Sequence, residues 1–409
     1  MGVAAFAYFL AVTQRSSLGV ATLIASERFH TNAQQLAYLA VFQLIVYAAM
    51  QIPVGILLDR FGSRSMLAVG AFIMTVGQMT VAFAPNLSTA VLGRMLVGMG
   101  DSFTFISMIR MVNGWYSGAK ASKWQQYISS GGQMGQFFSA VPFWIMLENF
   151  GWSPAFAIMA GGSALAVFLI IAFTSDEAMG QEEKHKTASL KIATEQLVGN
   201  FQNPGIRMSF WTHFVTQPTT TSVMLLWAVP FLVTAEGQSH DFAAFTLTSM
   251  VLFGFITGPI IGSWCAKYPE RRGLLVYGVV ALTSLTWVFI VTQGQALPAW
   301  VLYVCFLLIS IGGPASMIAF DFSKEIVPKQ RLGSANGFAN VGGFLATFVM
   351  MFITGVVIDL VHEGSSNPER YTVQAFQYGF AAQLSVVVIG ITFFTVERRK
   401  YLKTLQNRE

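Results

Sequence analysis

The sequence predicts an all-α membrane protein whose twelve transmembrane helices form two pseudo-symmetric six-helix bundles, and three observations predict it. Only 11% of the 409 residues are charged, whereas 54% are hydrophobic. Soluble proteins carry about 25% charged residues, so this composition excludes a water-exposed surface around a chain of this length. Apolar runs of about 20 residues, long enough to cross a bilayer, recur along the chain. The two halves of the sequence also align with each other.

Apolar runs between polar or Gly/Pro-containing stretches predict the twelve helices. In the first half they span about 2–24, 34–58, 66–84, 88–112, 123–147 and 153–173, and in the second half about 207–235, 241–265, 273–292, 297–321, 331–358 and 371–395. We expect four regions: an N-terminal bundle at 1–174, a cytoplasmic linker at 175–206, a C-terminal bundle at 207–396 and a cytoplasmic tail at 397–409.

The positions of lysine and arginine predict the orientation, because cytoplasmic loops retain positive charge. With both termini inside, 20 of the 24 basic residues fall on cytoplasmic loops, their helix edges and the tail. Arg28 and Arg370 fall on the opposite side, and Arg15 and Arg94 lie inside helices. We therefore expect a multi-pass protein of the cell membrane (inner or plasma membrane) with both termini cytoplasmic. The basic residues form no continuous face, which argues against nucleic acid as a partner. We expect a monomer in the lipid bilayer.

Motifs for catalysis or for a cofactor are missing from the sequence. Cys265 and Cys305 both lie in apolar stretches, so neither a disulfide framework nor a thiolate metal cage is available. There is no H-E-x-x-H pair, no Walker loop and no nucleophile elbow. We expect no catalytic residue, no metal and no cofactor, and hence no enzyme.

An internal duplication relates the two halves. At an offset of 207 residues, Gly55–Arg64 lies over Gly262–Arg271, and the same offset lays SSGGQMGQF at 129–137 over NGFANVGGF at 336–344. One offset without gaps serves two distant regions, which indicates a duplicated six-helix unit. Parallel repeats of this kind are typical of transporters that rock two bundles around a central site.

The stretch GILLDRFGSR, between the second and third helices, resembles the G-x-L-x-D-R-x-G-R/K loop signature of the major facilitator superfamily. GRMLVGMG in the fourth helix resembles that family's R-x-x-x-G-x-G element. The resemblance extends over essentially the whole chain and implies a solute transporter with alternating access. It also implies that the loop signature acts as a conformational gate, with five residues in this role: Gly55, Asp59, Arg60, Gly62 and Arg64.

If the signature is a gate, the Asp59 carboxylate lies at the positive N-terminal end of a facing helix. The resemblance implies that this helix is the eleventh. In the second-half copy of the signature, Ala266 stands at the position of Asp59. The charged contact of the gate therefore belongs mainly to the N-terminal half. The alternative is a topology and packing element without a gating role.

Two other functions remain as alternatives. Drug/proton antiporters of this superfamily carry a glycine run with Gly-Pro in their fifth helix, and SSGGQMGQFFSAVP in this chain lacks it. A similar string, GFITGPIIG, lies in the eighth helix, where a proline kink explains it. Drug/proton efflux is therefore the weaker alternative within the class. A membrane receptor or scaffold that uses the fold is the alternative from another class.

Arg15 lies near the middle of the first helix, where a cation costs at least about 2.5–3.5 kcal/mol. It must face the cavity or an internal anion, so we expect either substrate binding or a static ion pair. Arg94 and Asp101 project from one face of the fourth helix, with Gly98 between them. A direct pair, a water-bridged pair, or a pair of Asp101 with Arg15 are all open. We expect Asp101, with Arg94, to serve proton coupling, against a purely structural ion pair.

These three charges leave the interior of the N-terminal half with one excess positive charge, which favours an anionic substrate group. Asp321, near the cytoplasmic end of the tenth helix, could cancel that excess.

Polar side chains on other helices complete the expected substrate site. His213 and Gln217 share one face of the seventh helix, which Pro218 interrupts. His213 could also be hydrogen-bonded near the membrane edge. Amide side chains on the fifth and eleventh helices could form hydrogen bonds with substrate groups or with neighbouring helices. The full set of substrate-binding candidates is Arg15, Gln43, Tyr47, Gln133, Gln136, His213, Gln217, Asn336 and Asn340.

The sequence thus predicts a secondary active transporter. Its partner is a small polar solute, which we expect to be an organic anion or zwitterion carrying a carboxylate or phosphate. The proton is the expected coupling ion.

Overall fold

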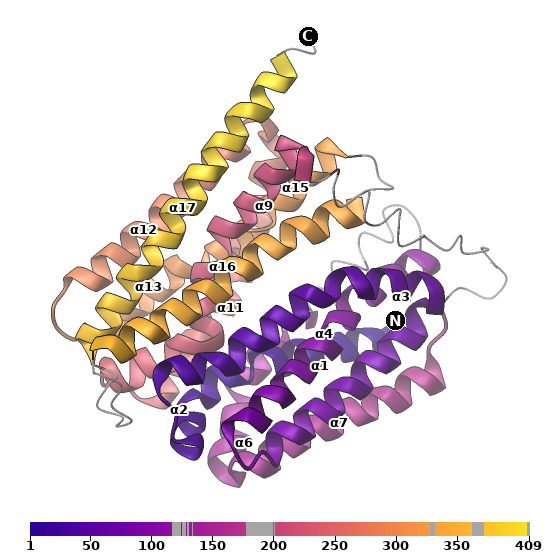
Figure 1. Ribbon diagram of the computed structural model, residues 1–409, viewed down its shortest axis with the longest axis vertical. Helices are drawn as coiled ribbons and strands as arrows, with labels where there is room; N and C mark the ends of the chain where they lie inside the picture. Colours follow the sequence, from indigo (N-terminus) through magenta and orange to yellow (C-terminus); the bar gives the residue numbers. More distant parts are fainter. Residues whose placement is uncertain are drawn as a thin grey trace. The chain divides into compact units, whose positions relative to one another are not determined.

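The computed structural model describes residues 1–116, 131–132, 134–176, 201–327, 332–361 and 372–406, together with the isolated residues 124, 128 and 199. Within these ranges the regular structure is helical throughout. The chain divides into two compact units: unit 1 comprises Met1–Phe29 and Tyr38–Leu190, and unit 2 comprises His30–Ala37 and Lys191–Glu409. Figure 1 shows the helices of both units.

Unit 1 contains the helices of the first half of the sequence. Its elements are α1 (Gly2–Ser16), α2 (Leu18–Phe29), most of α3 (Ala33–Ala82), α4 (Leu87–Trp115), α6 (Pro142–Phe150) and α7 (Trp152–Phe173). The first expected helix is broken between α1 and α2, whereas the second and third are both contained in α3. Residues 134–140 are helical and lead into α6, and much of the rest of the fifth expected segment lies outside the described residues.

A bend at Gly62 separates the two expected helices within α3. Gly62 has φ 79° and ψ 165°, which is non-helical backbone in a left-handed region that favours glycine. The next helix of the unit, α4, begins at a side-chain cap: Asn86 Oδ1 accepts a hydrogen bond from the Thr89 amide at 3.0 Å. Such caps satisfy the free amides of a first helical turn.

Unit 2 contains the helices of the second half of the sequence. Its elements are α9 (Pro204–Thr216), α10 (Pro218–Ser222), η1 (Val223–Trp227), η2 (Pro230–Ala235), α11 (His240–Lys267), η3 (Pro269–Arg271), α12 (Arg272–Thr292), α13 (Ala299–Ser310), α14 (Gly312–Ala315), α15 (Ile318–Ile326), α16 (Leu332–Val361) and α17 (Val373–Gln406). Figure 1 shows α9, α16 and α17 side by side, and these three helices pack against one another.

The seventh expected helix is interrupted where the sequence predicted it. The α-helix ends at Thr216 and resumes at Pro218, and η1 and η2, which follow, are π-helical. Proline lacks an amide donor, so it opens the hydrogen-bond ladder locally. At the other end of the unit, α17 continues to Gln406, well past residue 395, so the expected tail begins as helix.

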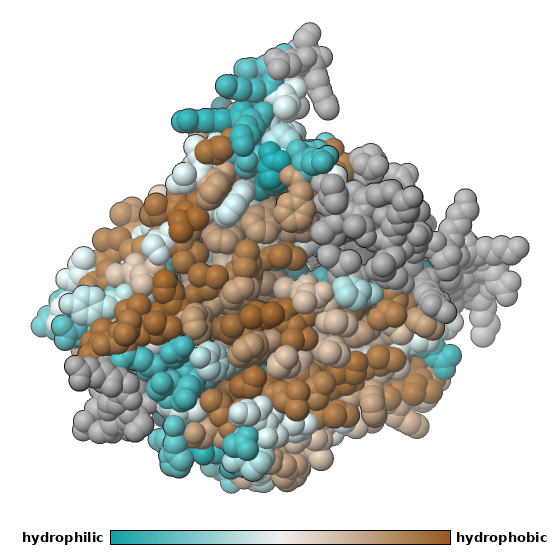
Figure 2. Space-filling view, in the orientation of Figure 1, coloured by the Kyte–Doolittle hydropathy of each residue, from teal (hydrophilic) through white to brown (hydrophobic). Residues whose placement is uncertain are grey.

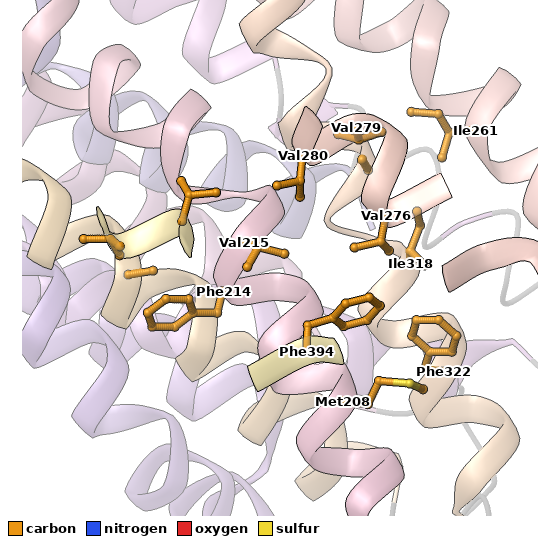
Figure 3. Packing of buried hydrophobic residues seen from close by; sticks show 14 of the residues in the cluster. Met208, Phe214, Val215, Ile261, Val276, Val279, Val280, Ile318, Phe322 and Phe394 are labelled. Atoms are coloured by element: carbon orange, nitrogen blue, oxygen red, sulfur yellow. The ribbon is translucent and has the colours of Figure 1, made fainter. Parts of the chain in front are cut away.

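Each unit has its own hydrophobic core. In unit 1, Ala4, Leu10, Met108 and Ile170 join α1, α4 and α7. In unit 2, the larger cluster in Figure 3 brings together side chains of α9, α12, α15 and α17. These residues are Met208, Phe214, Val215, Val276, Val280, Ile318, Phe322 and Phe394.

Residues 30–37 belong to unit 2 because α16 holds them. The Asp359 carboxylate accepts hydrogen bonds from the first amides of α3, with Oδ1 2.9 Å from Ala33 N and Oδ2 2.7 Å from Gln34 N. Gly355 lies one turn earlier on α16, and a Cβ there would lie 2.8 Å from the Ala33 carbonyl oxygen. Close packing and a carboxylate cap therefore fix this segment to α16.

Large apolar side chains cover the outside of the helices. Phe173, Trp300 and Leu360 are 70%, 71% and 73% exposed. Figure 2 shows hydrophobic residues over broad areas and hydrophilic residues gathered at the end of α17. Among the described residues, nine helices are long and apolar enough to cross a membrane. Exposed apolar surface of this extent is suited to lipid rather than to water.

Candidate functional site

Arg15 of α1 and Asp101 of α4 form a two-point ion pair within unit 1. Arg15 Nε lies 2.6 Å from Asp101 Oδ2, and Nη2 lies 2.8 Å from Oδ1. The Asp101 side chain is 1% exposed and that of Arg15 is 16% exposed. Of the arrangements that the sequence left open, Asp101 adopts the one with Arg15.

Arg94 binds backbone carbonyls next to the break between α1 and α2. Its Nη1 donates to Gln14 O at 3.1 Å, its Nη2 donates to Arg15 O at 3.1 Å, and Nη1 also lies 3.3 Å from Ser17 Oγ. The Arg94 side chain is almost fully buried. It therefore fixes the backbone that carries Arg15, which is a positioning role that the sequence did not indicate.

Tyr47 and Gln43 of α3 lie beside the ion pair of Arg15 and Asp101. The Arg15 guanidinium carbon lies 4.9 Å from the centre of the Tyr47 ring, a cation–π distance. Gly98, between Arg94 and Asp101 on α4, lies so close to α3 that a Cβ would overlap the Gln43 backbone oxygen. The missing side chain thus lets α3 and α4 approach where the charged groups meet.

Three buried polar atoms around this centre have no hydrogen-bond partner among the described residues: Gln14 Oε1, Gln43 Nε2 and Arg94 Nε. Buried polar groups are usually paired, so such atoms mark places for water or for the polar groups of a ligand. The Gln14 amide nitrogen is bound, because it donates to the Met159 carbonyl at 3.0 Å and to the Ser163 hydroxyl. Gln14 was not among the predicted site residues. Its position beside an intramembrane arginine was the signal for it.

The predicted residues of the fifth helix are only partly described. Gln133 lies outside the described residues, and Gln136 is half-buried in the helical stretch before α6. Gly135 packs directly against α1, since a Cβ there would lie 2.9 Å from the Thr13 amide nitrogen. The stretch that carries Gln136 is therefore held close to α1.

The loop signature lies on α3 around its bend. Gly55, Asp59 and Arg60 are within the helix before the bend, and the side chains of these two charged residues lie outside the described part of the structure. Gly62 is the bend itself, and Arg64 follows it in the second half of α3. The gating role of this set stays a prediction.

In unit 2, His213 and Gln217 of α9 meet α16 at Gly343. A Cβ at position 343 would overlap the His213 ring and would lie 2.8 Å from Gln217 Oε1. His213 is 1% exposed, and its Nδ1 has no hydrogen-bond partner among the described residues. The Phe320 ring lies edge-on at 5.2 Å between centroids. His213 is thus buried inside unit 2.

Asn336 and Asn340 lie on α16, two turns and one turn before Gly343, respectively. Both are half-buried. The Asn336 Oδ1 atom has no hydrogen-bond partner among the described residues. Residues spaced by three and four share one helical face, so Asn336, Asn340 and Gly343 form one stripe. This stripe and the α9 face that carries His213 supply the polar side chains expected in unit 2.

The arrangement suits recognition of a solute more than covalent chemistry. No group of three or more His, Cys, Asp or Glu that could hold a metal is found among the residues that the structure describes. What unit 1 offers is the part-exposed Arg15 side chain, the buried Asp101 carboxylate, and the amide atoms of Gln14 and Gln43 without a partner among the described residues. These groups can bind an anion and hydroxyl groups.

Sequence comparison relates this chain to sugar-acid transporters. The chain is 23% identical over 390 residues to a probable L-galactonate transporter of Escherichia coli K12, covering 87% of this chain and 82% of that protein. It is 21% identical over 370 residues to the hexuronate transporter of Bacillus subtilis 168, covering 84% of each. It is 24% identical to the probable galactarate/D-glucarate transporter GudP of B. subtilis 168, covering 76% of this chain and 75% of that protein.

Solved structures share the fold. A bacterial homologue of the human lysosomal transporter Spinster, in an inward-facing and unoccupied conformation, matches with a TM-score of 0.77 and 15% identity over 98% of this chain and 96% of that chain. A POT family transporter in complex with 5-aminolevulinic acid matches with a TM-score of 0.68 and 12% identity over 97% and 96%. These likenesses confirm the predicted fold class.

A family profile gives the assignment. Residues 4–351 match the profile of the Major Facilitator Superfamily, and residues 219–409 match it a second time. The expectation of a transporter rather than an enzyme is confirmed by this match and by the relatives. The chain belongs to the Major Facilitator Superfamily of membrane transporters.

Proposed function

We propose that this chain is a secondary active transporter of small organic anions, and that sugar acids such as galactonate, glucarate or a hexuronate are the substrate class. The observation that carries the proposal is the charge of the unit 1 centre. Arg15 pairs with the buried carboxylate of Asp101, whereas the buried Arg94 donates to backbone carbonyls, so this centre holds two cations and one carboxylate. One positive charge in excess in a low-dielectric interior attracts an anion.

The relatives support the same class independently. Those that align over most of their length include transporters named for L-galactonate, for galactarate or D-glucarate, and for hexuronate. Each of these solutes carries a carboxylate and several hydroxyl groups. Arg15 suits the carboxylate. The side chains that suit the hydroxyls are the amides of Gln43, Gln133, Gln136, Gln217, Asn336 and Asn340, the phenol of Tyr47 and the imidazole of His213.

Proton coupling follows from competition for Arg15. While Asp101 is ionised, its carboxylate accepts hydrogen bonds from Nε and Nη2 of Arg15. A proton on an Asp101 oxygen removes that charge, and the guanidinium can then bind the substrate carboxylate. Deprotonation restores the ion pair and releases the anion. One proton and one anion therefore move together, and alternating access carries both across the membrane.

The orientation and the gate complete the proposal. We place both termini in the cytoplasm because the basic residues gather on that set of loops. The loop signature around Gly62 then lies on the cytoplasmic side and acts as the conformational gate. We further propose a monomer in the cell membrane.

A thermal-shift screen of the purified protein tests the substrate class, because a bound ligand stabilises the folded state by mass action. The panel holds aldonates, aldarates and hexuronates, the matching neutral sugars, sugar phosphates, small peptides and cationic drugs. We expect stabilisation by the sugar acids and not by the neutral sugars. Proteoliposomes with an imposed pH gradient then test uptake. Stabilisation by cationic drugs alone would contradict the proposal.

A further inference from the structure

A second acidic residue, Asp176, binds the loop signature from a distant part of unit 1. It stands three residues after α7, which ends at Phe173. Its Oδ1 accepts a hydrogen bond from the backbone amide of Arg64 at 2.5 Å. Arg64 opens the second half of α3, directly after the bend at Gly62.

This contact replaces a local helix cap. The first amides of a helix have no intrahelical acceptor, and a side chain next to the helix start usually accepts from them. The residue at the bend is Gly62, which has no side chain. The acceptor comes instead from a residue 112 positions away in the sequence.

Gly62 is required by the same contact. A Cβ at position 62 would overlap the Asp176 carboxylate, and the backbone there has a φ of +79°. The glycine of the signature thus serves two purposes: it permits the bend, and it admits the capping carboxylate.

The contact is reciprocal. The Arg64 guanidinium donates from Nη2 to the carbonyl of Ile171, in the last turn of α7. Carbonyls of a last turn lack intrahelical donors, and a cation is favoured there as an anion is favoured at a helix start. On the other flank, Trp115 Nε1 at the end of α4 donates to the Ser175 carbonyl at 3.0 Å. The segment after α7 is therefore tied to both α3 and α4.

We propose that Asp176 is a positioning residue of the loop signature: it holds the bend of α3 and thereby sets the direction of the backbone that carries Asp59 and Arg60. The bend holds only while the end of α7 stays beside Arg64, so a movement of α7 is transmitted to the signature. This inference rests on the proposed gating role of the signature. It needs no particular substrate.

Three variants of the full-length protein in membranes test it: Asp176→Ala, Asp176→Asn, and Asp241→Ala as the matched control. Asp241 is an exposed acid in the first turn of α11. Asparagine keeps an oxygen that can cap a helix, whereas alanine does not.

The first readout is hydrogen exchange of the Arg64 amide. We expect exchange about five- to tenfold faster in Asp176→Ala, and wild-type exchange in Asp176→Asn and in the control. Unchanged exchange in Asp176→Ala would overturn the cap.

The second readout is alkylation of a single cysteine at position 136, with the buried Cys265 and Cys305 replaced by serine. It reports the accessibility of this half-buried position and is measured without substrate. We expect a changed labelling rate in Asp176→Ala and not in Asp176→Asn. Faster amide exchange with unchanged labelling would reduce Asp176 to a static cap and overturn the positioning role.

Gly62→Ala keeps the proposal testable if Asp176→Ala does not fold. It should reproduce both changes, since its methyl group displaces the carboxylate. If both single variants fold, the double variant should be no worse than Gly62→Ala alone, because the methyl group has already displaced the carboxylate and its removal adds nothing. Wild-type behaviour of Gly62→Ala, or additive effects in the double variant, would contradict the inference. If wild-type protein transports no sugar acid, the proposed substrate class fails, while both of these readouts still decide the role of Asp176.

Discussion

Arg15 and Asp101 hold each other at two points, at 2.6 Å and 2.8 Å, with the carboxylate buried and the guanidinium part-exposed. A bidentate pair of this kind has one defined geometry and is stronger than a single-point pair. An incoming carboxylate would compete for the same donors. In the proposed mechanism, protonation of Asp101 frees Arg15 to bind the substrate carboxylate.

Asp101→Asn should separate exchange from accumulation. The amide keeps the shape and an acceptor for Arg15, but it can neither bind nor release the proton. We expect accumulation driven by a pH gradient to be lost, with counterflow of labelled substrate retained. Proteoliposome uptake with and without the gradient measures both. Gradient-driven accumulation that survives in the variant would remove Asp101 as the coupling residue.

Arg94→Ala should destabilise unit 1. The guanidinium donates to the Gln14 and Arg15 carbonyls, and its loss removes both bonds, although the Ser17 hydroxyl still donates to Gln14 O. We expect a loss of about 2–4 kcal/mol, seen as a lower melting temperature. Arg94→Lys, which keeps the charge but not the fork, should be intermediate. A melting temperature equal to wild type in Arg94→Ala would show that the carbonyls find other donors.

Gly343→Ala should disturb His213, because the new methyl group would overlap the imidazole. We expect destabilisation of about 1–3 kcal/mol, the usual result of overpacking a core. Gly337→Ala on the same helix is the matched control, since nothing lies within 4 Å of a Cβ there. That variant should be neutral or more stable by up to about 1 kcal/mol, as expected for Gly→Ala in a helix. Equal melting temperatures for the two variants would refute the close contact between α9 and α16.

Glu236 should make the stability of unit 2 pH-dependent. It is 5% exposed, lies between η2 and α11, and accepts a hydrogen bond from the Leu297 amide at 2.6 Å. Burial raises the pKa of Glu236 above its usual 4.5, and the Leu297 bond offsets this in part. A raised folded-state pKa contributes stability that is present below about 4.5 and lost as the pH rises through the raised pKa.

Glu236→Gln keeps an acceptor for Leu297 and does not titrate. We expect the melting temperature of wild type, relative to this variant, to fall as the pH rises from 4 to 7. Melting curves of the two proteins in the same buffers measure the difference. A difference that does not change with pH would show that the pKa of Glu236 is the same in the folded and unfolded chain.

The helical segments could be predicted because lipid imposes a length and a composition on each of them. The breaks within them were harder to foresee. The interruption at Pro218 was predicted, since proline lacks a donor. The break at Ser17 was not, because the Gln14 and Arg15 carbonyls just before it are bound by Arg94, which lies far away in the sequence.

The extension of α17 to Gln406 was also missed. Hydropathy marks only the apolar run, whereas the polar residues after it still favour a helix.

The residues of the candidate site could be predicted where a charged side chain would raise the free energy of a helix in lipid. Arg15, Arg94 and Asp101 stood out for this reason, and the structure brings Arg15 and Asp101 together. Their pairing was not predictable, because the side-chain spacing on α4 left several partners within reach. Asp176 gave no signal, since an acid after an apolar run is ordinary and its partner is a backbone amide 112 positions away.

Ligand binding by a charge-balanced variant tests the role of Arg15 most directly. Arg15→Gln alone leaves a buried carboxylate without its partner, which costs about 3–5 kcal/mol. Arg15→Gln combined with Asp101→Asn removes both charges, and Asp101→Asn alone is its control. Calorimetric titration with galactonate should give saturable binding to wild type and to Asp101→Asn, and binding about 10- to 100-fold weaker in the double variant. Wild-type affinity in the double variant would contradict anion recognition by Arg15.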